Sequence, residues 1–131
     1  MNLTRYRWLW WAVTVIGVGF AIYFQLRPSA TYEPFAWYQW ERSWDALKHL
    51  AAYFLLAIAY YLASAEGNKA ASFSRFLGFI WPVMLLGVVL ETAQIWVPQR
   101  NFNLYDIAAN VLGPALAWFI LRPLGRMWFQ T

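Results

Sequence analysis

The chain of 131 residues is 62% hydrophobic and 12% charged, whereas soluble domains contain roughly 25% charged residues. Its 10 Lys and Arg and 6 Asp and Glu are too few to cover a soluble domain of this size, so the composition argues against that class and indicates an integral membrane protein. The basic residues are spread as singles and loose pairs, which argues against a nucleic-acid-binding patch, and the lack of cysteine excludes disulfides and thiolate metal sites.

The first predicted element, residues 8–26, carries no charge and is long enough to cross a hydrocarbon core of roughly 30 Å as a helix. Arg5 and Arg7 precede it, as in the basic start of a signal peptide. The apolar run exceeds the roughly 7 to 15 residues of a signal peptide, and no convincing small-residue cleavage site follows it. We therefore expect this segment to remain as a membrane anchor.

Residues 28–43, which follow this anchor, are too polar and too few to cross the membrane. The segment holds two carboxylates and a group of aromatic residues, Tyr32, Phe35, Trp37, Tyr38 and Trp40. Tyrosine and tryptophan concentrate where hydrocarbon meets water. We therefore expect an interfacial loop, lying in the headgroup region, between the first two membrane spans.

Three further apolar segments, residues 44–64, 76–97 and 104–121, predict an all-α, four-helix membrane bundle that forms one domain over residues 1–131. Each of the three carries polar side chains near one end only. These are Asp45, Lys48 and His49 in the first, Glu91 and Gln94 in the second, and Asp106 and Asn110 in the third. The polar side chains lie at the start of the second span, at the end of the third and at the start of the fourth. Successive spans cross the membrane in opposite directions. We therefore expect these side chains at one face of the bilayer, around a common pocket.

The distribution of basic residues predicts which face this is. The loops on the polar side carry three basic residues, Arg27, Arg42 and Arg100, whereas the two termini and the remaining loop carry six, Arg5, Arg7, Lys69, Arg75, Arg122 and Arg126. Cytoplasmic segments of membrane proteins are enriched in Lys and Arg. We therefore expect both termini in the cytoplasm and the polar pocket at the outer face.

Charged side chains inside membrane spans need an explanation, because each costs about 2.5 to 3.5 kcal/mol at the bilayer centre. One explanation is structural: ion pairs such as Lys48 with Glu91, or Arg100 with Asp106, would gather the helices without any chemistry. The other is a water-lined cavity for a substrate or an ion. The polar residues crowd one end of the spans, which argues against a conducting path across the membrane.

Three polar motifs follow one another along the chain: Asp45-x-x-x-His49-x-x-x-Tyr53, Glu91-x-x-Gln94-x-x-x-Pro98-x-Arg100 and Asp106-x-x-x-Asn110-x-x-Gly113. In this order they resemble the VanZ-like family of small bacterial membrane proteins, named for an accessory teicoplanin-resistance protein. The resemblance covers the second to fourth spans and implies a location in the bacterial cytoplasmic membrane. Two positions depart from the family pattern, since Ala46 stands where Lys is usual and Ala117 stands where a second Gly is frequent.

VanZ-like proteins are similar, in their helical core and polar residues, to a wider group for which chemistry at the phosphate of a lipid headgroup has been proposed. The resemblance therefore implies a membrane lipid or polyprenyl-linked envelope precursor as partner, headgroup transfer or hydrolysis as reaction, and an effect on glycopeptide (teicoplanin) susceptibility. Under that hypothesis His49 is the general base or nucleophile. Its orienting carboxylate is Asp45, Glu91 or Asp106.

Under the same hypothesis, the other polar residues bind the substrate. Arg100 would hold the phosphate, because a guanidinium matches two phosphate oxygens. Neighbouring oxygens or the headgroup would be bound by Asn110, Gln94, Lys48 and Tyr53. No metal is assigned, although Glu91, Asp106 and His49 leave open a divalent cation such as Mg²⁺, Mn²⁺ or Ca²⁺. The alternative function is a non-catalytic protein that binds or shields a lipid-linked precursor or a glycopeptide.

Overall fold

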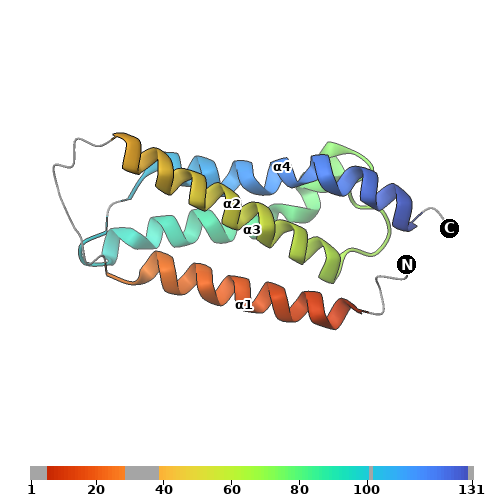
Figure 1. The fold of residues 1–131 in the computed structure, drawn as a ribbon, viewed down its shortest axis with the longest axis horizontal. Coiled ribbons are helices and arrows are strands. Elements are labelled where there is room, and N and C mark those ends of the chain that lie inside the picture. The colour runs from red at the N-terminus through yellow and green to blue at the C-terminus, as the bar shows by residue number, and fades with distance from the viewer. Residues whose placement is uncertain (1–5, 29–38, 101, 130–131) are drawn as a thin grey trace.

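The computed structural model describes residues 6–28, 39–100 and 102–129, and within these ranges the chain is helical without a strand. Figure 1 shows four long helices, α1 (Arg7–Leu26), α2 (Gln39–Ser64), α3 (Phe73–Ala93) and α4 (Leu104–Phe129). A short 3-10 helix, η2 (Gln94–Trp96), continues α3. All four long helices have the length and hydropathy needed to cross a membrane. The predicted all-α architecture with four candidate membrane spans is therefore confirmed.

Three helices extend by three or more residues beyond the apolar segments that predicted them. The predicted starts at residues 44 and 76 become Gln39 for α2 and Phe73 for α3, and the predicted end at residue 121 becomes Phe129 for α4. Hydropathy marks only the apolar part of a helix, whereas the backbone hydrogen-bond ladder continues into polar flanking residues. Most of the predicted aromatic loop, residues 29–38, lies outside the described residues.

The extension of α4 past residue 121 packs against the loop between α2 and α3. A Cβ atom added at Gly125 would lie 2.5 Å from Asn68 Oδ1 and 3.0 Å from the hydroxyl oxygen of Tyr61, so these two side chains pack directly against the backbone of α4. Pro123 lies inside the extension and contributes no backbone N–H. Membrane helices tolerate proline where neighbouring groups accommodate the freed backbone, so this proline does not end the helix.

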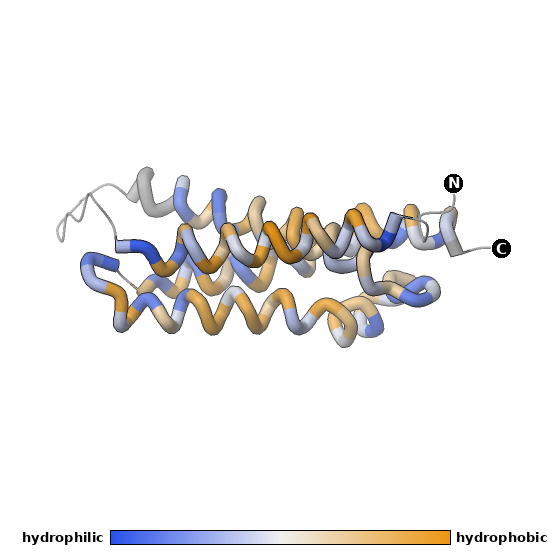
Figure 2. The backbone as a smooth tube through the Cα atoms, turned by 90° about the horizontal axis from the view of Figure 1, so that it is seen from below, coloured by the Kyte–Doolittle hydropathy of each residue, from blue (hydrophilic) through white to orange (hydrophobic). Residues whose placement is uncertain are grey.

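The helices alternate in direction, and the first turn of α1 and the last turn of α4 lie at the same end of the bundle (Figure 1). We call the opposite end the polar end; it contains the end of α1, the starts of α2 and α4, and the end of α3. Hydrophobic residues follow the middle of the bundle, and hydrophilic residues gather toward its two ends (Figure 2). The buried core includes Tyr53, Ala57, Tyr61, Phe76, Ile80, Ala117 and Leu121.

The contact between α2 and α4 is the most extensive one between helices, and a glycine allows the two helices to approach closely. A Cβ atom added at Gly113 would lie 2.4 Å from the carbonyl oxygen of Leu50, so α4 touches the backbone of α2 at this point. Gly87 has a similar role between α3 and α4, because its added Cβ would lie 2.6 Å from Asn110 Cβ. These two contacts lie beside the predicted polar residues and fix the three helices that carry them.

Helix α1 is fastened to the bundle by arginine near each of its ends. Near its start, the Nε of Arg7 donates to the carbonyl oxygen of Ala63 at 2.9 Å. At its end, the Nε of Arg100 donates to the carbonyl oxygen of Arg27 at 2.9 Å, and a second nitrogen of Arg100 donates to the carbonyl of Phe24. The carbonyls at a helix end lack partners within the helix. Arg100 therefore both satisfies the last turn of α1 and holds it to the turn between α3 and α4.

Candidate functional site

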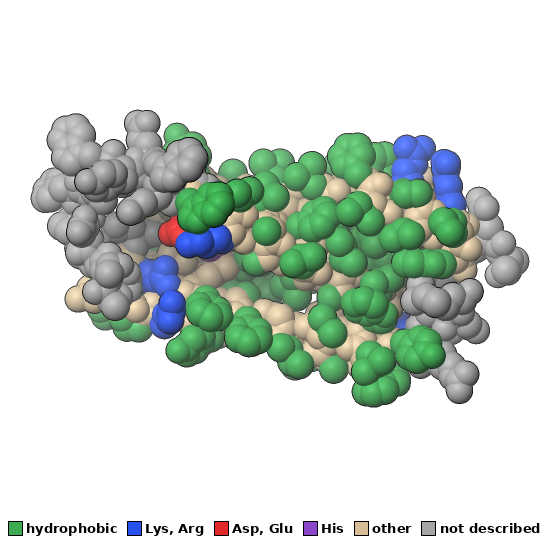
Figure 3. All heavy atoms as spheres, in the orientation of Figure 1, with side chains coloured by type: hydrophobic (Ala, Val, Ile, Leu, Met, Phe, Trp, Pro, Cys, Tyr) green, Lys and Arg blue, Asp and Glu red, His purple; other side chains and the backbone are tan. Residues whose placement is uncertain are grey.

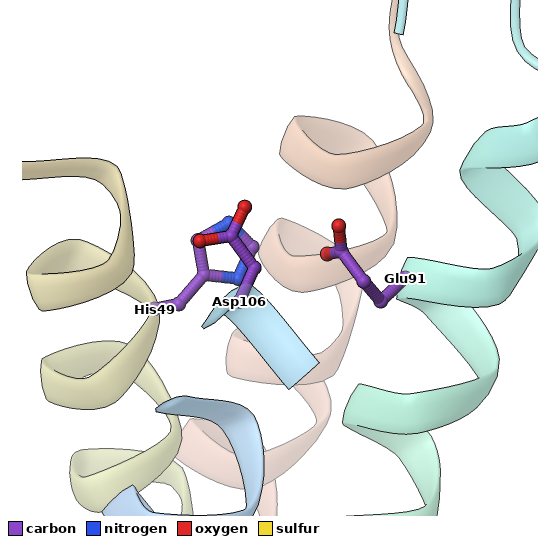
Figure 4. A group of neighbouring side chains, drawn as sticks. All are labelled: His49, Glu91 and Asp106. Atoms are coloured by element: carbon purple, nitrogen blue, oxygen red, sulfur yellow. The ribbon is translucent and has the colours of Figure 1, made fainter. Parts of the chain in front are cut away.

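Three of the four residues predicted to be catalytic converge at the polar end. His49, Glu91 and Asp106 come from α2, α3 and α4, and their side chains point toward one another (Figure 4). One nitrogen or carboxylate oxygen from each lies within 4.8 Å of the others. Glu91 is 0% exposed and Asp106 is 7% exposed, whereas His49 is half-buried. The trio therefore has two enclosed carboxyl groups and one accessible imidazole.

The Asn110 side chain determines how the imidazole of His49 is held. Its Nδ2 donates to the carbonyl oxygen of Gly87 at 3.1 Å, which fixes the orientation of the amide. Asn110 Oδ1 then faces His49 Nδ1 at 2.9 Å, and because an amide oxygen only accepts, Nδ1 carries the proton and donates. In the neutral ring the other nitrogen, Nε2, keeps its lone pair and can accept a proton. Asn110, predicted to bind substrate, thus positions the predicted base.

Glu91 is held by two hydrogen bonds, one from the end of α3 itself and one from the residue that precedes α4. Gln94 Nε2 donates to Glu91 Oε2 at 3.2 Å, and the backbone N–H of Asn103 donates to Glu91 Oε1 at 3.2 Å. Asn103 Oδ1 in turn accepts from the backbone N–H of Tyr105 at 3.0 Å, as a residue capping a helix start does. Gln94, predicted to bind substrate, therefore supports Glu91. Asn103 was not among the residues predicted from the sequence, although Asn just before a predicted helix is a familiar capping signal.

Asp106 carries the feature of the trio that most favours a ligand. Its Oδ1 is buried and has no hydrogen-bond partner among the side chains and backbone that the structure describes. A buried polar atom without a partner costs free energy, so such an atom needs an explanation. Divalent cations such as Mg²⁺, Mn²⁺ and Ca²⁺ prefer carboxylate oxygens, and the trio supplies two carboxyl groups and an imidazole. His49, Glu91 and Asp106 are thus the residues that could hold a cation.

Asp45 and Lys48 lie at the edge of the site instead of inside it. Their side chains are 57% and 65% exposed, and Lys48 Nζ lies 3.3 Å from Asp45 Oδ1. Asp45 is thus paired with Lys48, while Nδ1 of His49 faces Asn110. The two ion pairs considered from the sequence, Lys48 with Glu91 and Arg100 with Asp106, do not form among the described side chains. Structural ion pairing within the described residues therefore accounts for Asp45 and Lys48 but not for Glu91 and Asp106.

A cavity of about 800 Å³ lies between α1 and α2 and reaches this site. His49 is the member of the trio that lines the cavity, together with the predicted binding residues Lys48, Tyr53 and Arg100. Gln25 of α1 also lines it; this residue is 7% exposed, and its Nε2 donates to the hydroxyl oxygen of Tyr53 at 2.9 Å. The sequence reasoning missed Gln25. The available signal was an amide side chain near the end of an otherwise largely apolar span.

The chain matches no protein-family model, no curated protein and no solved structure. The residues and their geometry are therefore the basis on which a function is assigned.

Proposed function

We propose that the chain acts on the phosphate or headgroup of a membrane lipid, or of a lipid-linked envelope precursor, at the outer face of the bacterial cytoplasmic membrane. The observation that carries this proposal is the position of His49. Its imidazole lines a cavity between two candidate membrane spans, and two enclosed carboxyl groups lie within 4.8 Å of it. A base that faces a membrane-embedded cavity is suited to a substrate that is itself part of the membrane. The resemblance to VanZ-like proteins supports the same reaction class.

In the proposed reaction, His49 Nε2 accepts a proton from water or from an acceptor alcohol. The oxygen of that molecule forms a bond to phosphorus while the bond from phosphorus to the leaving oxygen breaks. The imidazolium then returns its proton to the leaving oxygen, so the enzyme ends in its starting state. Glu91 and Asp106 stabilise the imidazolium. With a divalent cation bound, the same two carboxylates would hold it, and its charge would neutralise the phosphate. Lys48 supplies positive charge from the cavity wall.

The other predicted residues have indirect roles in this proposal. Asn110 holds the tautomer of His49, and Gln94 holds Glu91, so both are positioning residues. Arg100 donates two of its hydrogen bonds to carbonyls of α1, and its charge still faces the cavity. It therefore contributes to the electrostatic attraction of a phosphate while it fastens α1.

The test is turnover by purified protein on defined polyprenyl phosphates and glycerophospholipids, with headgroup release followed by mass spectrometry in the presence of Mg²⁺, Mn²⁺ or a chelator. We expect His49→Gln to lower the rate by about 10² to 10⁴, the usual contribution of a general base. Glu91→Gln should also lower the rate. Glu66→Gln is the matched control, because the same change falls on an exposed carboxylate next to the far end of α2.

The alternative is a protein that binds or shields a lipid-linked precursor or a glycopeptide without turnover. It shares the cavity but does not need the base. Wild-type protein that binds a lipid and releases no headgroup from any substrate would favour this alternative. Full glycopeptide protection by His49→Gln in cells, at normal expression, would favour it as well.

A further inference from the structure

The cavity between α1 and α2 is an elongated groove. On α1 its walls run from Val13 to Pro28, and on α2 they run from Ala59 to Asp45. At a rise of 1.5 Å per residue, both walls extend about 20 Å along the helix axes. One leaflet supplies about half of the roughly 30 Å hydrocarbon core. The groove is therefore as long as one leaflet with part of its headgroup layer.

The walls of the groove change in polarity along this length. The inner part, toward the middle of the bundle, is apolar and is lined by Val13, Gly17, Leu55, Leu56 and Ala59. The outer part carries Arg27, Asp45, Lys48, His49 and Arg100. A lipid has the same order of properties, a hydrocarbon chain followed by a charged headgroup. The groove thus reproduces the polarity of a single leaflet inside the protein.

The groove is accessible from the side of the bundle that would face lipid. Phe20 and Phe24 on its α1 wall and Leu55 on its α2 wall are 57%, 47% and 63% exposed, so large apolar side chains form its margins. Figure 3 views this side of the molecule: charged side chains gather at the polar end of the seam, and hydrophobic side chains follow the same two helices away from it. A lipid chain could therefore enter sideways from the bilayer.

The polar end of the groove favours an anion. Three cationic side chains line it, Arg27, Lys48 and Arg100, and Asp45 is the carboxylate in this lining. The enclosed carboxyl groups of Glu91 and Asp106 lie near His49 but do not line the groove. Gln25 Oε1, also in the wall, is buried without a hydrogen-bond partner in the described part of the chain. This oxygen can accept a hydrogen bond from a hydroxyl group of a lipid headgroup or backbone. A buried, unpartnered acceptor in the same groove as three cations is suited to a phosphate that bears a hydroxylated group.

We propose that this groove binds one hydrocarbon chain of an anionic phospholipid, with the phosphate beside Lys48 and Arg27 and in front of His49. The inference rests on the proposed function, because it names the lipid class that would meet the base. The apolar part of the groove holds the chain, and the cationic end selects against zwitterionic headgroups. Turnover then occurs on a substrate held by both its chain and its phosphate.

The experiment is native mass spectrometry of the full chain in detergent, titrated with phosphatidylglycerol or with phosphatidylcholine of the same acyl composition. We expect one phosphatidylglycerol to be retained at concentrations where phosphatidylcholine is not. Ala52→Phe should lower this retention about tenfold or more, because Ala52 lines the groove and an added ring fills it. The matched control is Ala51→Phe, on the neighbouring exposed residue outside the groove, which should bind as wild type does.

A second pair of variants keeps the test valid if Ala52→Phe does not fold. Ala21→Phe fills the groove from α1, and Ala12→Phe is its exposed counterpart outside the groove. Lys48→Gln should reduce the preference for phosphatidylglycerol without weakening the retention of phosphatidylcholine. Equal lipid retention by the groove variants and their controls, or no preference of the wild-type protein for the anionic lipid, would overturn the proposal.

Turnover measured on the same variants separates this inference from the proposed function. If His49→Gln retains the lipid but loses turnover, both the proposed reaction and the proposed lipid groove are supported. If the groove variants lose the lipid and the wild-type protein turns over no substrate, the groove stands and the reaction fails. If turnover is high and Ala52→Phe does not alter it, the reaction stands and the groove is wrong.

Discussion

Helix α2 has two unlike neighbours. Against α4 it is packed to backbone contact at Gly113, whereas against α1 it leaves a cavity of about 800 Å³. His49 belongs to both sides, because Asn110 of α4 holds its Nδ1 and the ring also lines the cavity. We call the contact between α2 and α4 the closed seam, and the contact between α1 and α2, with its cavity, the open seam. The closed seam fixes the geometry of the site, and the open seam gives access to it. The proposed function needs both properties, since a lipid would arrive from the bilayer and then meet a positioned group.

The two seams differ because they are held by different interactions. Lipid tails are as apolar as the side chains, so helices in a bilayer associate through close packing and polar contacts instead of hydrophobic burial. Gly113 provides close packing along the closed seam. Along the open seam, Arg7 and Arg100 bind backbone carbonyls near the two ends of α1. These contacts near its ends hold α1 in the bundle while the groove remains between α1 and α2.

The largest effect is expected from filling the closed seam with Gly113→Leu. Even its Cβ would lie 2.4 Å from a backbone oxygen that cannot move aside, so we expect a loss of about 3 kcal/mol or more and little folded protein. Gly19→Leu is the control, because an added Cβ there has no neighbour within 4 Å. Thermal unfolding in detergent, followed by circular dichroism, measures both. Equal stability of the two variants would contradict a closed seam.

Removal of the Asn110 amide should have the next largest effect. Asn110→Ala leaves the carbonyl of Gly87 and Nδ1 of His49 without their partner, at a cost of about 2 kcal/mol. Thr92→Val is the comparison, because its hydroxyl bonds the carbonyl of Val88 within the same helix, and we expect a change within about 0.5 kcal/mol. Circular dichroism measures both. A cost for Asn110→Ala no larger than for Thr92→Val would show that α4 does not hold the imidazole.

Release of one end of α1 should widen the open seam without unfolding the bundle. Arg100→Gln removes the guanidinium that holds the last turn of α1. The chain has no cysteine, so spin labels at Ile22→Cys and Leu47→Cys report the separation of α1 and α2 without background labelling. We expect a broader distance distribution by electron paramagnetic resonance. Arg75→Gln, which changes an exposed arginine at the other end, should leave it unchanged; broadening by both variants would contradict a local role for Arg100.

The smallest effect is expected from Gly17→Ala in the open seam. Its added Cβ would lie 3.1 Å from Leu56 Cδ1, the end of a flexible side chain that can move, so the stability should change by about 0.5 kcal/mol or less. The same substitution at Gly87 places a Cβ atom 2.6 Å from Asn110 Cβ, and there we expect a loss of about 1 to 3 kcal/mol. The temperature midpoints of thermal unfolding are compared between the two variants. A larger loss at Gly17 would mean that the middle of α1 is tightly packed.

The sequence predicted the spans and the convergence of His49, Glu91 and Asp106 because both follow from one-dimensional patterns. Apolar runs of sufficient length predict spans, and alternating direction brings their polar ends to one side. Such patterns could not predict which group each polar side chain contacts. Asp45 was an expected neighbour of the imidazole, but its carboxylate pairs with Lys48 one turn along the same helix. The imidazole instead contacts Asn110 of α4, because the rotation of each helix about its own axis determines which side chains of different helices meet.

The sequence by itself determined a membrane-embedded helical bundle and a polar end with a single histidine, since composition and hydropathy depend on the residues alone. The tertiary structure decided that Asn110 orients this histidine, that Arg100 fastens α1, and that a groove lies between α1 and α2. These features depend on how closely each pair of helices approaches. That distance is set by contacts between residues far apart in the chain, such as Gly113 with Leu50, which no local pattern encodes.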